Sequence, residues 1–120
     1  MFGFFSNPAN SVAYDPGAAV RDAATGAITV IDVRDGAELR ATGRAKGALH
    51  VPLATLRMKA DPASPEQLPA FRSGKPVVLY CASGARSQMA ARMLRQMGLE
   101  EVYNLGGLAD WQRAGGHIAR

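Results

Sequence analysis

An apolar run, a short loop and a helix-forming stretch follow one another between residues 76 and 98, and this unit constrains the fold most. Pro76–Tyr80 is a nearly continuous apolar run with two adjacent β-branched residues, which is typical of a buried strand in a parallel sheet. Residues 87–97 are rich in strong helix formers, and Gly98 follows as a stop signal. The loop between them begins at Cys81, the only cysteine of the chain. The unit predicts a thiol at the junction of a strand and a helix.

The rest of the chain continues this alternation of strand-like and helix-like segments. Asp15 and Pro16 form a helix-start signal, and Gly26 closes that region. The strands expected elsewhere span residues 27–33, 48–51 and 102–105, and the helical segments span 36–42, 54–58 and 108–113, with a helical turn near 66–68 in a proline-containing connection over 61–69. This alternation predicts an α/β domain with a mainly parallel central sheet and helices on both faces. Ligands of such sheets bind outside the carboxyl ends of the strands, where Cys81 is expected.

Size and composition fit one compact domain. The 120 residues are 48% hydrophobic, and we expect a single domain over 1–120 with a core from about 24 to 118 and a loosely ordered stretch over 1–12. No apolar run approaches the length of a membrane span, and the apolar residues 2–5 are too few for a signal peptide. We therefore expect a cytoplasmic protein.

Charge and cysteine content exclude several functions. The net charge is +4, but the basic residues are scattered, without a basic run or a basic–aromatic platform, so we expect no nucleic-acid partner. The positive field favours small anionic substrates instead. One cysteine cannot form an internal disulfide. A zinc site would need more ligands than the scattered His50, His117 and Cys81 provide, so we expect no metal.

The loop from Cys81 to Ser87 has the composition of an anion-binding site. The start of a helix presents free backbone N–H groups, and these favour a thiolate over a neutral thiol. Gly84 lets the backbone curl, and Arg86 can form paired hydrogen bonds with an oxyanion such as a sulfonate. The alternative for Arg86 is a salt bridge to a nearby carboxylate. The other loop residues contribute mainly amides and small side chains around an open pocket: Ala82, Ser83 and Ala85.

Several residues receive structural interpretations. Ser87 is expected to cap the helix, because serine is a favoured N-cap residue. Asp32 and Arg34 lie at a strand end, where we expect them to hold neighbouring loops through hydrogen bonds or an ion pair. Trp111 is expected in the core, and the structural alternative for Cys81 is a buried, unreactive thiol. Three methionines at helical spacing are expected to be buried or half-buried: Met89, Met93 and Met97.

Four segments, in order, resemble the rhodanese-like family over roughly residues 28–117. They are Val30–Arg34, similar to the family's early DVR strand end; Gly43–Ala48, in the place of its GHIPGA segment; Cys81–Ser87, matching its active-loop pattern C-x-x-G-x-R-S; and Asn104–Trp111, similar to its L-x-GG-xxx-W close. Arg44 and Lys46 stand where the family's second segment has histidine and proline.

The resemblance implies a three-layer rhodanese-like fold and a thiosulfate sulfurtransferase. A sulfane sulfur from thiosulfate or a similar anionic donor would pass to cyanide, a thiol or an acceptor protein through a persulfide on Cys81, without a cofactor. Single-domain members of the family imply a monomer. Some members carry a basic residue just after the cysteine, whereas Arg86 is the only fixed cation in this loop. The substrate-binding residues implied are the loop itself: Ala82, Ser83, Gly84, Ala85, Arg86 and Ser87.

Two other functions stay open. Related phosphatases and arsenate reductases use a Cys…Arg loop with five intervening residues, whereas four separate Cys81 from Arg86. The shorter loop suits a single sulfur better than a tetrahedral phosphate, and Tyr80 stands where those phosphatases usually have histidine. The last hypothesis is a module that binds a partner or carries a persulfide without independent turnover.

Overall fold

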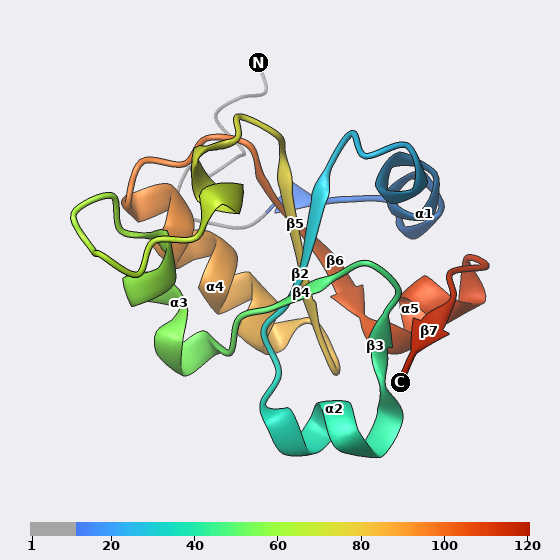
Figure 1. The fold of residues 1–120 in the computed structure, drawn as a ribbon. Coiled ribbons are helices and arrows are strands. Elements are labelled where there is room, and N and C mark those ends of the chain that lie inside the picture. Colours follow the sequence, from blue (N-terminus) through green and yellow to red (C-terminus); the bar gives the residue numbers. More distant parts are fainter. Residues whose placement is uncertain (1–11) are drawn as a thin grey trace.

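A five-stranded parallel sheet forms the centre of the computed structural model, which describes residues 12–120 (Figure 1). Its strand order is β1–β6–β5–β2–β4, and every neighbouring pair runs parallel. The strands span Val12–Ala13 (β1), Thr29–Asp32 (β2), Leu49–His50 (β4), Val77–Cys81 (β5) and Val102–Gly107 (β6). The predicted α/β class with a mainly parallel central sheet is confirmed, and β5 lies in the middle of that sheet.

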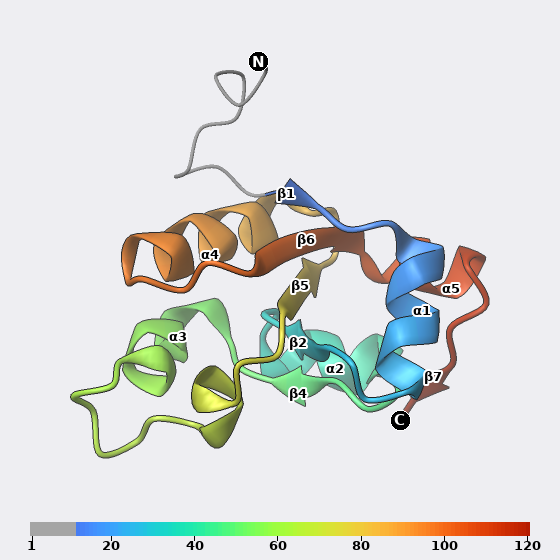
Figure 2. The ribbon, with the colours of Figure 1, turned by 90° about the horizontal axis from the view of Figure 1, so that it is seen from above.

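Helices cover both faces of this sheet, as Figure 2 shows. They span Pro16–Ala24 (α1), Gly36–Thr42 (α2), Leu53–Ala60 (α3), Ala85–Gln96 (α4) and Leu108–Arg113 (α5), with a short 3-10 helix at Pro69–Arg72 (η2). The helices α3 and α4 pack on one face, and α1 and α5 pack on the other. The helix α2 lies beyond the carboxyl end of β2, on the side where β5 also ends (Figure 1).

Alternate side chains of β5 enter two separate apolar cores. Val77, Leu79 and Cys81 belong to the core beneath α3 and α4. Val78 and Tyr80 belong to the core beneath α1 and α5. Because both sets are buried, the strand is apolar without interruption in the sequence. This alternation directs the Cys81 side chain towards the α4 side of the sheet.

Local capping explains where α1 and α2 begin. Asp15 Oδ2 accepts the N–H of Ala18 at 2.9 Å, and Pro16 takes the first helical position. Asp35 and Glu38 form a capping box, in which each side chain accepts the backbone N–H of the other, at 2.9 and 3.1 Å. Both helices begin at the residues that the sequence predicts.

Some short elements differ from the prediction. A two-stranded antiparallel sheet of Arg44–Ala45 (β3) and Ile118–Ala119 (β7) is not predicted, because two-residue strands are too short to show alternation. The helical turn expected near 66–68 lies instead in η2, which starts at Pro69. The helix α3 runs from Leu53 to Ala60 and is longer than the predicted 54–58.

The described chain starts at Val12, which pairs with Tyr103 of β6. The expectation of a loosely ordered start concerns mainly residues 1–11, which lie outside the described residues. Within residues 12–120, no helix has the length and apolar character needed to cross a membrane.

A buried polar cluster ties β2 and β5 to the segment that follows α2. Asp32 and Arg34 form an ion pair of 2.7 Å, with side chains 0% and 3% exposed. Tyr80 donates its hydroxyl hydrogen to Asp32 at 2.6 Å and accepts the N–H of Ala45 at 2.8 Å. Arg34 also donates to the carbonyl oxygen of Gly43 at 2.6 Å. The expectation that Asp32 and Arg34 hold neighbouring loops is confirmed, and their cluster anchors β5 just before Cys81.

Candidate active site

Cys81 is the last residue of β5, and the chain turns from it into α4 through a short loop. Gly84 makes this turn possible with a φ of 102°, a conformation that residues with a Cβ rarely adopt. A Cβ at Gly84 would also lie 3.3 Å from the Cα of Gly106 in β6. The loop is therefore folded closely against the neighbouring strand.

Hydrogen-bond donors of the loop surround the Cys81 sulfur. The N–H of Gly84 donates to Sγ at 3.0 Å, and the hydroxyl oxygen of Ser87 lies 3.5 Å from Sγ. Burial raises the pKa of this thiol, but hydrogen bonds from the Ser87 hydroxyl and from the N–H groups of Ser87, Gly84 and Ser83 lower it further than burial raises it. The net result is a thiol pKa below its ordinary value.

The Cys81 side chain is fully covered, with an exposed fraction of 0%. The side chain belongs to the apolar core beneath α4. This burial agrees with the alternative interpretation of Cys81 as a structural thiol. The donors around Sγ set it apart from an unreactive buried thiol, whose pKa would be raised. The adjacent loop residues Ala82 and Ser83 are exposed and carry small side chains.

Ser87 does not cap α4, and this prediction is wrong. Gly84 takes the N-cap position and the helix begins at Ala85, because the positive φ of the glycine turns the chain into the helix early. Ser87 therefore lies in the first helical turn with an exposed fraction of 0%. Its hydroxyl donates to Oδ1 of Asn104 in β6 at 2.7 Å. The serine thus links α4 to β6 beside the thiol.

Arg86 forms a salt bridge, which is one of the two roles that its sequence position allows. Its Nη1 and Nη2 donate to Oε1 and Oε2 of Glu38 in α2 at 2.6 and 2.8 Å. The bond from Arg86 lowers the pKa of Glu38 to about 2, and the same bond raises the pKa of Arg86. Both groups are therefore charged at neutral pH. The pair fixes the guanidinium beside the loop while leaving 37% of the Arg86 side chain exposed.

Asn104 of β6 is a candidate that sequence reasoning missed. Its Oδ1 accepts the Ser87 hydroxyl at 2.7 Å and the N–H of Gly106 at 3.0 Å. Its Nδ2 donates to the carbonyl oxygen of Gly84 at 3.1 Å. The sequence signal was its place at the start of the Asn104–Trp111 motif, which does not show that its amide faces the loop.

The double glycine of that motif also belongs to the site. A Cβ at Gly107 would lie 2.3 Å from the carbonyl oxygen of Ala82, so only glycine permits this approach of loop and strand. Gly106 has a φ of 111°, and the pairing of β5 with β6 shifts register between Leu79 and Tyr80. The end of β6 is shaped to receive the loop.

The other residues singled out in the sequence lie elsewhere. Trp111 is 3% exposed and belongs to the core, as predicted. Met93 and Met97 pack against the core beneath α4, but Met89 is 56% exposed, so the prediction for Met89 is wrong. Positions four apart drift around a helix, which carries the first methionine off the buried face. Within residues 12–120, no group of three or more potential metal ligands occurs.

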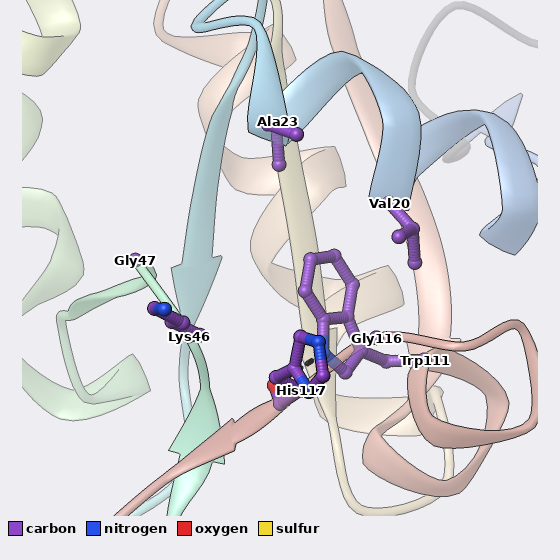
Figure 3. Close-up of a pocket in the computed structure, with 8 residues that line it drawn as sticks. Val20, Ala23, Lys46, Gly47, Trp111, Gly116 and His117 are labelled. Carbon is purple, nitrogen blue, oxygen red and sulfur yellow. Dashed lines mark hydrogen bonds between the residues drawn. The ribbon is translucent and has the colours of Figure 1, made fainter.

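A hollow of about 400 Å³ lies apart from the thiol (Figure 3). The helix α1 contributes Val20 and Ala23, and the C-terminal part of the chain contributes Trp111 and His117, with Lys46 across from them. None of the loop residues 81–87 lines it. The hollow was not predicted, and it adds no group to the loop site.

Comparison with known proteins identifies the family. The rhodanese-like domain family matches residues 15–114, and the chain belongs to this family. The chain is 39% identical over 83 residues to the uncharacterized protein YqhL of Bacillus subtilis, covering 68% of this chain and 59% of that protein. It therefore spans less than two thirds of the length of that relative.

Two further relatives carry functional names. A sulfurtransferase of Allochromatium vinosum is 38% identical over 89 residues, covering 73% of this chain and 75% of that protein. The thiosulfate sulfurtransferase GlpE of Coxiella burnetii is 36% identical over 86 residues, covering 71% and 72%. The chain thus has sulfurtransferase homologues along most of its length.

Solved structures show the same fold. A protein of unknown function from Rhodopseudomonas palustris, described as a possible tyrosine phosphatase, has a TM-score of 0.82 and 33% identity, covering 91% of this chain and 85% of that one. The human single-domain sulfurtransferase TSTD1 has a TM-score of 0.67 and 25% identity, covering 90% and 97%.

Proposed function

We propose that this protein is a sulfurtransferase in which Cys81 is the nucleophile. The observation that carries the proposal is the 3.0 Å hydrogen bond from the Gly84 N–H to the Cys81 sulfur at the carboxyl end of the central strand. Such a donor favours the thiolate, which is the reactive form of cysteine. The named sulfurtransferase relatives, similar along most of the chain, support the same reaction class.

The proposed reaction proceeds in two steps. The Cys81 thiolate attacks the outer sulfur of thiosulfate; the S–S bond of the donor breaks, sulfite leaves with the bonding electron pair, and a persulfide remains on Cys81. An acceptor then attacks the outer sulfur of the persulfide. With cyanide as the acceptor, thiocyanate leaves and the Cys81 thiolate returns. Covalent catalysis of this kind predicts ping-pong kinetics.

The loop around the sulfur has groups suited to both steps. Backbone N–H groups at the start of α4 would stabilise negative charge on the attacking sulfur and on the persulfide. Arg86 uses one N–H of each terminal nitrogen for Glu38, so further N–H donors of its guanidinium remain for a sulfonate. The small side chains of Ala82, Ser83 and Ala85 leave room for a donor beside the loop.

Intact mass measurement after incubation with thiosulfate tests this proposal. We expect the protein to gain the mass of one sulfur, and cyanide to remove it with release of thiocyanate. Cys81→Ser should gain no sulfur and show no turnover, with an unchanged circular dichroism spectrum. A wild-type protein that gains no sulfur, or a Cys81→Ser variant that still turns over, contradicts the proposal.

A persulfide carrier without independent turnover is the second candidate. The observation that favours it is the fully covered Cys81, with 0% exposure, which restricts the approach of free substrates to the sulfur. Steady-state assays with thiosulfate and a panel of acceptors, cyanide and small thiols, distinguish the two. Stoichiometric loading without turnover by any acceptor supports the carrier, and repeated turnover supports the enzyme.

Phosphate ester hydrolysis is the third candidate, favoured by the description of the Rhodopseudomonas palustris structure. The four residues between Cys81 and Arg86 form a small loop, which suits a single sulfur better than a tetrahedral phosphate. We expect no hydrolysis of phenyl phosphate. Hydrolysis that disappears in Cys81→Ser would restore this candidate.

A further inference from the structure

The hydroxyl of Ser87 has one hydrogen and more than one acceptor within reach. Oδ1 of Asn104 lies at 2.7 Å and Sγ of Cys81 lies at 3.5 Å. The carbonyl oxygen of Gly106 is also at 3.5 Å, which is long for an oxygen acceptor, whereas sulfur bonds at longer range because its radius is larger. The hydroxyl hydrogen of Ser87 can therefore bond either to the amide oxygen of Asn104 or to the sulfur of Cys81.

Backbone groups fix the orientation of the Asn104 amide. The N–H of Gly106, which can only donate, faces Oδ1 at 3.0 Å. The carbonyl oxygen of Gly84, which can only accept, faces Nδ2 at 3.1 Å. The Asn104 atom that faces Ser87 is consequently an oxygen, which cannot donate. Ser87 must be the donor in that 2.7 Å contact, and its hydrogen then points away from the sulfur.

We propose that Asn104 is a positioning residue that controls how strongly the Ser87 hydroxyl stabilises the Cys81 thiolate. When Cys81 is a thiolate, the hydroxyl turns about its C–O bond and donates to Sγ. When Sγ is bonded to a second sulfur, the charge lies on the outer sulfur and the hydroxyl returns to Asn104. No covalent bond changes in this exchange. The inference rests on the proposed function in one respect, the use of Cys81 as the nucleophile.

The charged groups near the thiol do not take part in the contact between Ser87 and Asn104. Arg86 of α4 interacts electrostatically with Cys81, and Glu38 of α2 binds its guanidinium at 2.6 and 2.8 Å. Asp110 of α5 accepts the N–H of Gly107 at 2.8 Å. The residues of β6 that reach the loop, including Asn104, carry no charge. The ion pair of Arg86 is formed with Glu38 alone and uses neither Ser87 nor Asn104.

A thermodynamic cycle at two positions tests the proposal. The pKa of Cys81 is measured from the ultraviolet absorbance of the thiolate over a pH series, with Cys81→Ser as the blank, because the chain has one cysteine. Ser87→Ala is introduced into three backgrounds: the wild type, Asn104→Leu and Asn104→Asp. The measured quantity is the rise in thiol pKa on loss of the hydroxyl in each background. Thermal unfolding shows which variants are folded.

The proposal predicts an order for these three shifts. In Asn104→Leu the hydroxyl has no competing amide oxygen, so its loss raises the thiol pKa most. In Asn104→Asp a charged acceptor holds the hydroxyl more firmly, so its loss raises the pKa least. We expect the extremes to differ by about one pKa unit, or about tenfold in the ratio of thiolate to thiol. A cycle of this kind isolates the coupling of the two residues from the effect of each alone.

Equal shifts in all three backgrounds would overturn the proposal and leave Asn104 a purely structural role. If Asn104→Leu does not fold, the wild type and Asn104→Asp still give the comparison. Aspartate keeps an oxygen towards Ser87 but loses the bond from Nδ2 to the Gly84 carbonyl oxygen, and the cycle cancels this loss because it is common to both members of the pair. The titration requires no sulfur transfer. A protein that shows the predicted order but gains no sulfur from thiosulfate supports this inference and contradicts the proposed function. A protein that gains sulfur but shows equal pKa shifts contradicts this inference and supports the proposed function.

Discussion

Arg86 binds Glu38 and is also the residue that we propose to bind the sulfonate of a substrate. The bidentate contact to Glu38, at 2.6 and 2.8 Å, holds the guanidinium in one orientation. It also neutralises the only cation among residues 81–87, so the loop itself has little net charge. We therefore expect Arg86 to recognise a sulfonate by directed hydrogen bonds more than by long-range attraction.

Arg86→Lys tests this role, because lysine keeps the charge but lacks the planar fork of donors. We expect sulfur loading from thiosulfate to slow by about tenfold or more, the range for losing a hydrogen bond to a charged group. Time-resolved intact mass measures the loading rate. Arg72→Lys, in η2, is the control and should load at the wild-type rate. An unchanged rate in Arg86→Lys would confine Arg86 to its contact with Glu38.

At the scale of elements, the decisive contact is that of the β5–α4 loop with β6. The positive φ of Gly84 and the missing side chain of Gly107 let two backbones meet at a distance that any Cβ would prevent. Asn104 then binds the loop from the same strand. The shape of the thiol site thus depends on the end of a strand that does not contain Cys81.

Gly107→Ala tests this contact, since its Cβ would lie 2.3 Å from the Ala82 carbonyl oxygen. We expect a loss of about 1–3 kcal/mol in the free energy of unfolding, as for other overpacked sites, together with slower sulfur loading. Urea denaturation and intact mass measure the two effects.

Gly36→Ala is the matched control, because its Cβ would meet only the flexible end of Arg40 at 3.3 Å. Alanine there should leave the stability equal or slightly higher, because alanine favours helices over glycine. If Gly107→Ala were as stable as Gly36→Ala, the close approach of loop and strand would not matter for the free energy of unfolding.

At the scale of the whole molecule, Tyr80 connects the central strand to segments that are distant in the sequence. Its hydroxyl joins Asp32 of β2 and the backbone of Ala45 in β3, on the side of the sheet opposite Cys81. Burial and the bond to Asp32 keep the pKa of Tyr80 well above its ordinary value, so the phenol stays neutral and can donate. One strand therefore carries the proposed nucleophile on one face and an anchor on the other.

Tyr80→Phe should lower the free energy of unfolding by about 1–3 kcal/mol, because Asp32 and the Ala45 N–H each lose a buried partner. Tyr103→Phe is the control: its hydroxyl contacts Glu101 at 3.2 Å at the surface, and its removal should change the stability by about 0.5 kcal/mol or less. Equal effects of the two substitutions in urea denaturation would rule out the anchoring role of Tyr80.

Much of this fold can be predicted from local patterns. The capping signals at Asp15 and Asp35 mark the helix starts, and the apolar run before Cys81 marks the central strand. Such signals depend on neighbours a few residues apart, which a sequence shows directly. The two-residue strands β3 and β7 carry no such signal, because only their partners make them strands.

The sequence by itself determined the class of fold, the place of the single thiol between a strand and a helix, and the family. The tertiary structure alone decided which groups meet that thiol. Glu38 and Arg86 are 48 positions apart in the chain, and Ser87 and Asn104 are 17 apart. Their side chains meet because parallel strands end at one edge of the sheet and bring distant segments together there. No local periodicity encodes such a meeting, so the partners that tune Cys81 follow only from the packed chain.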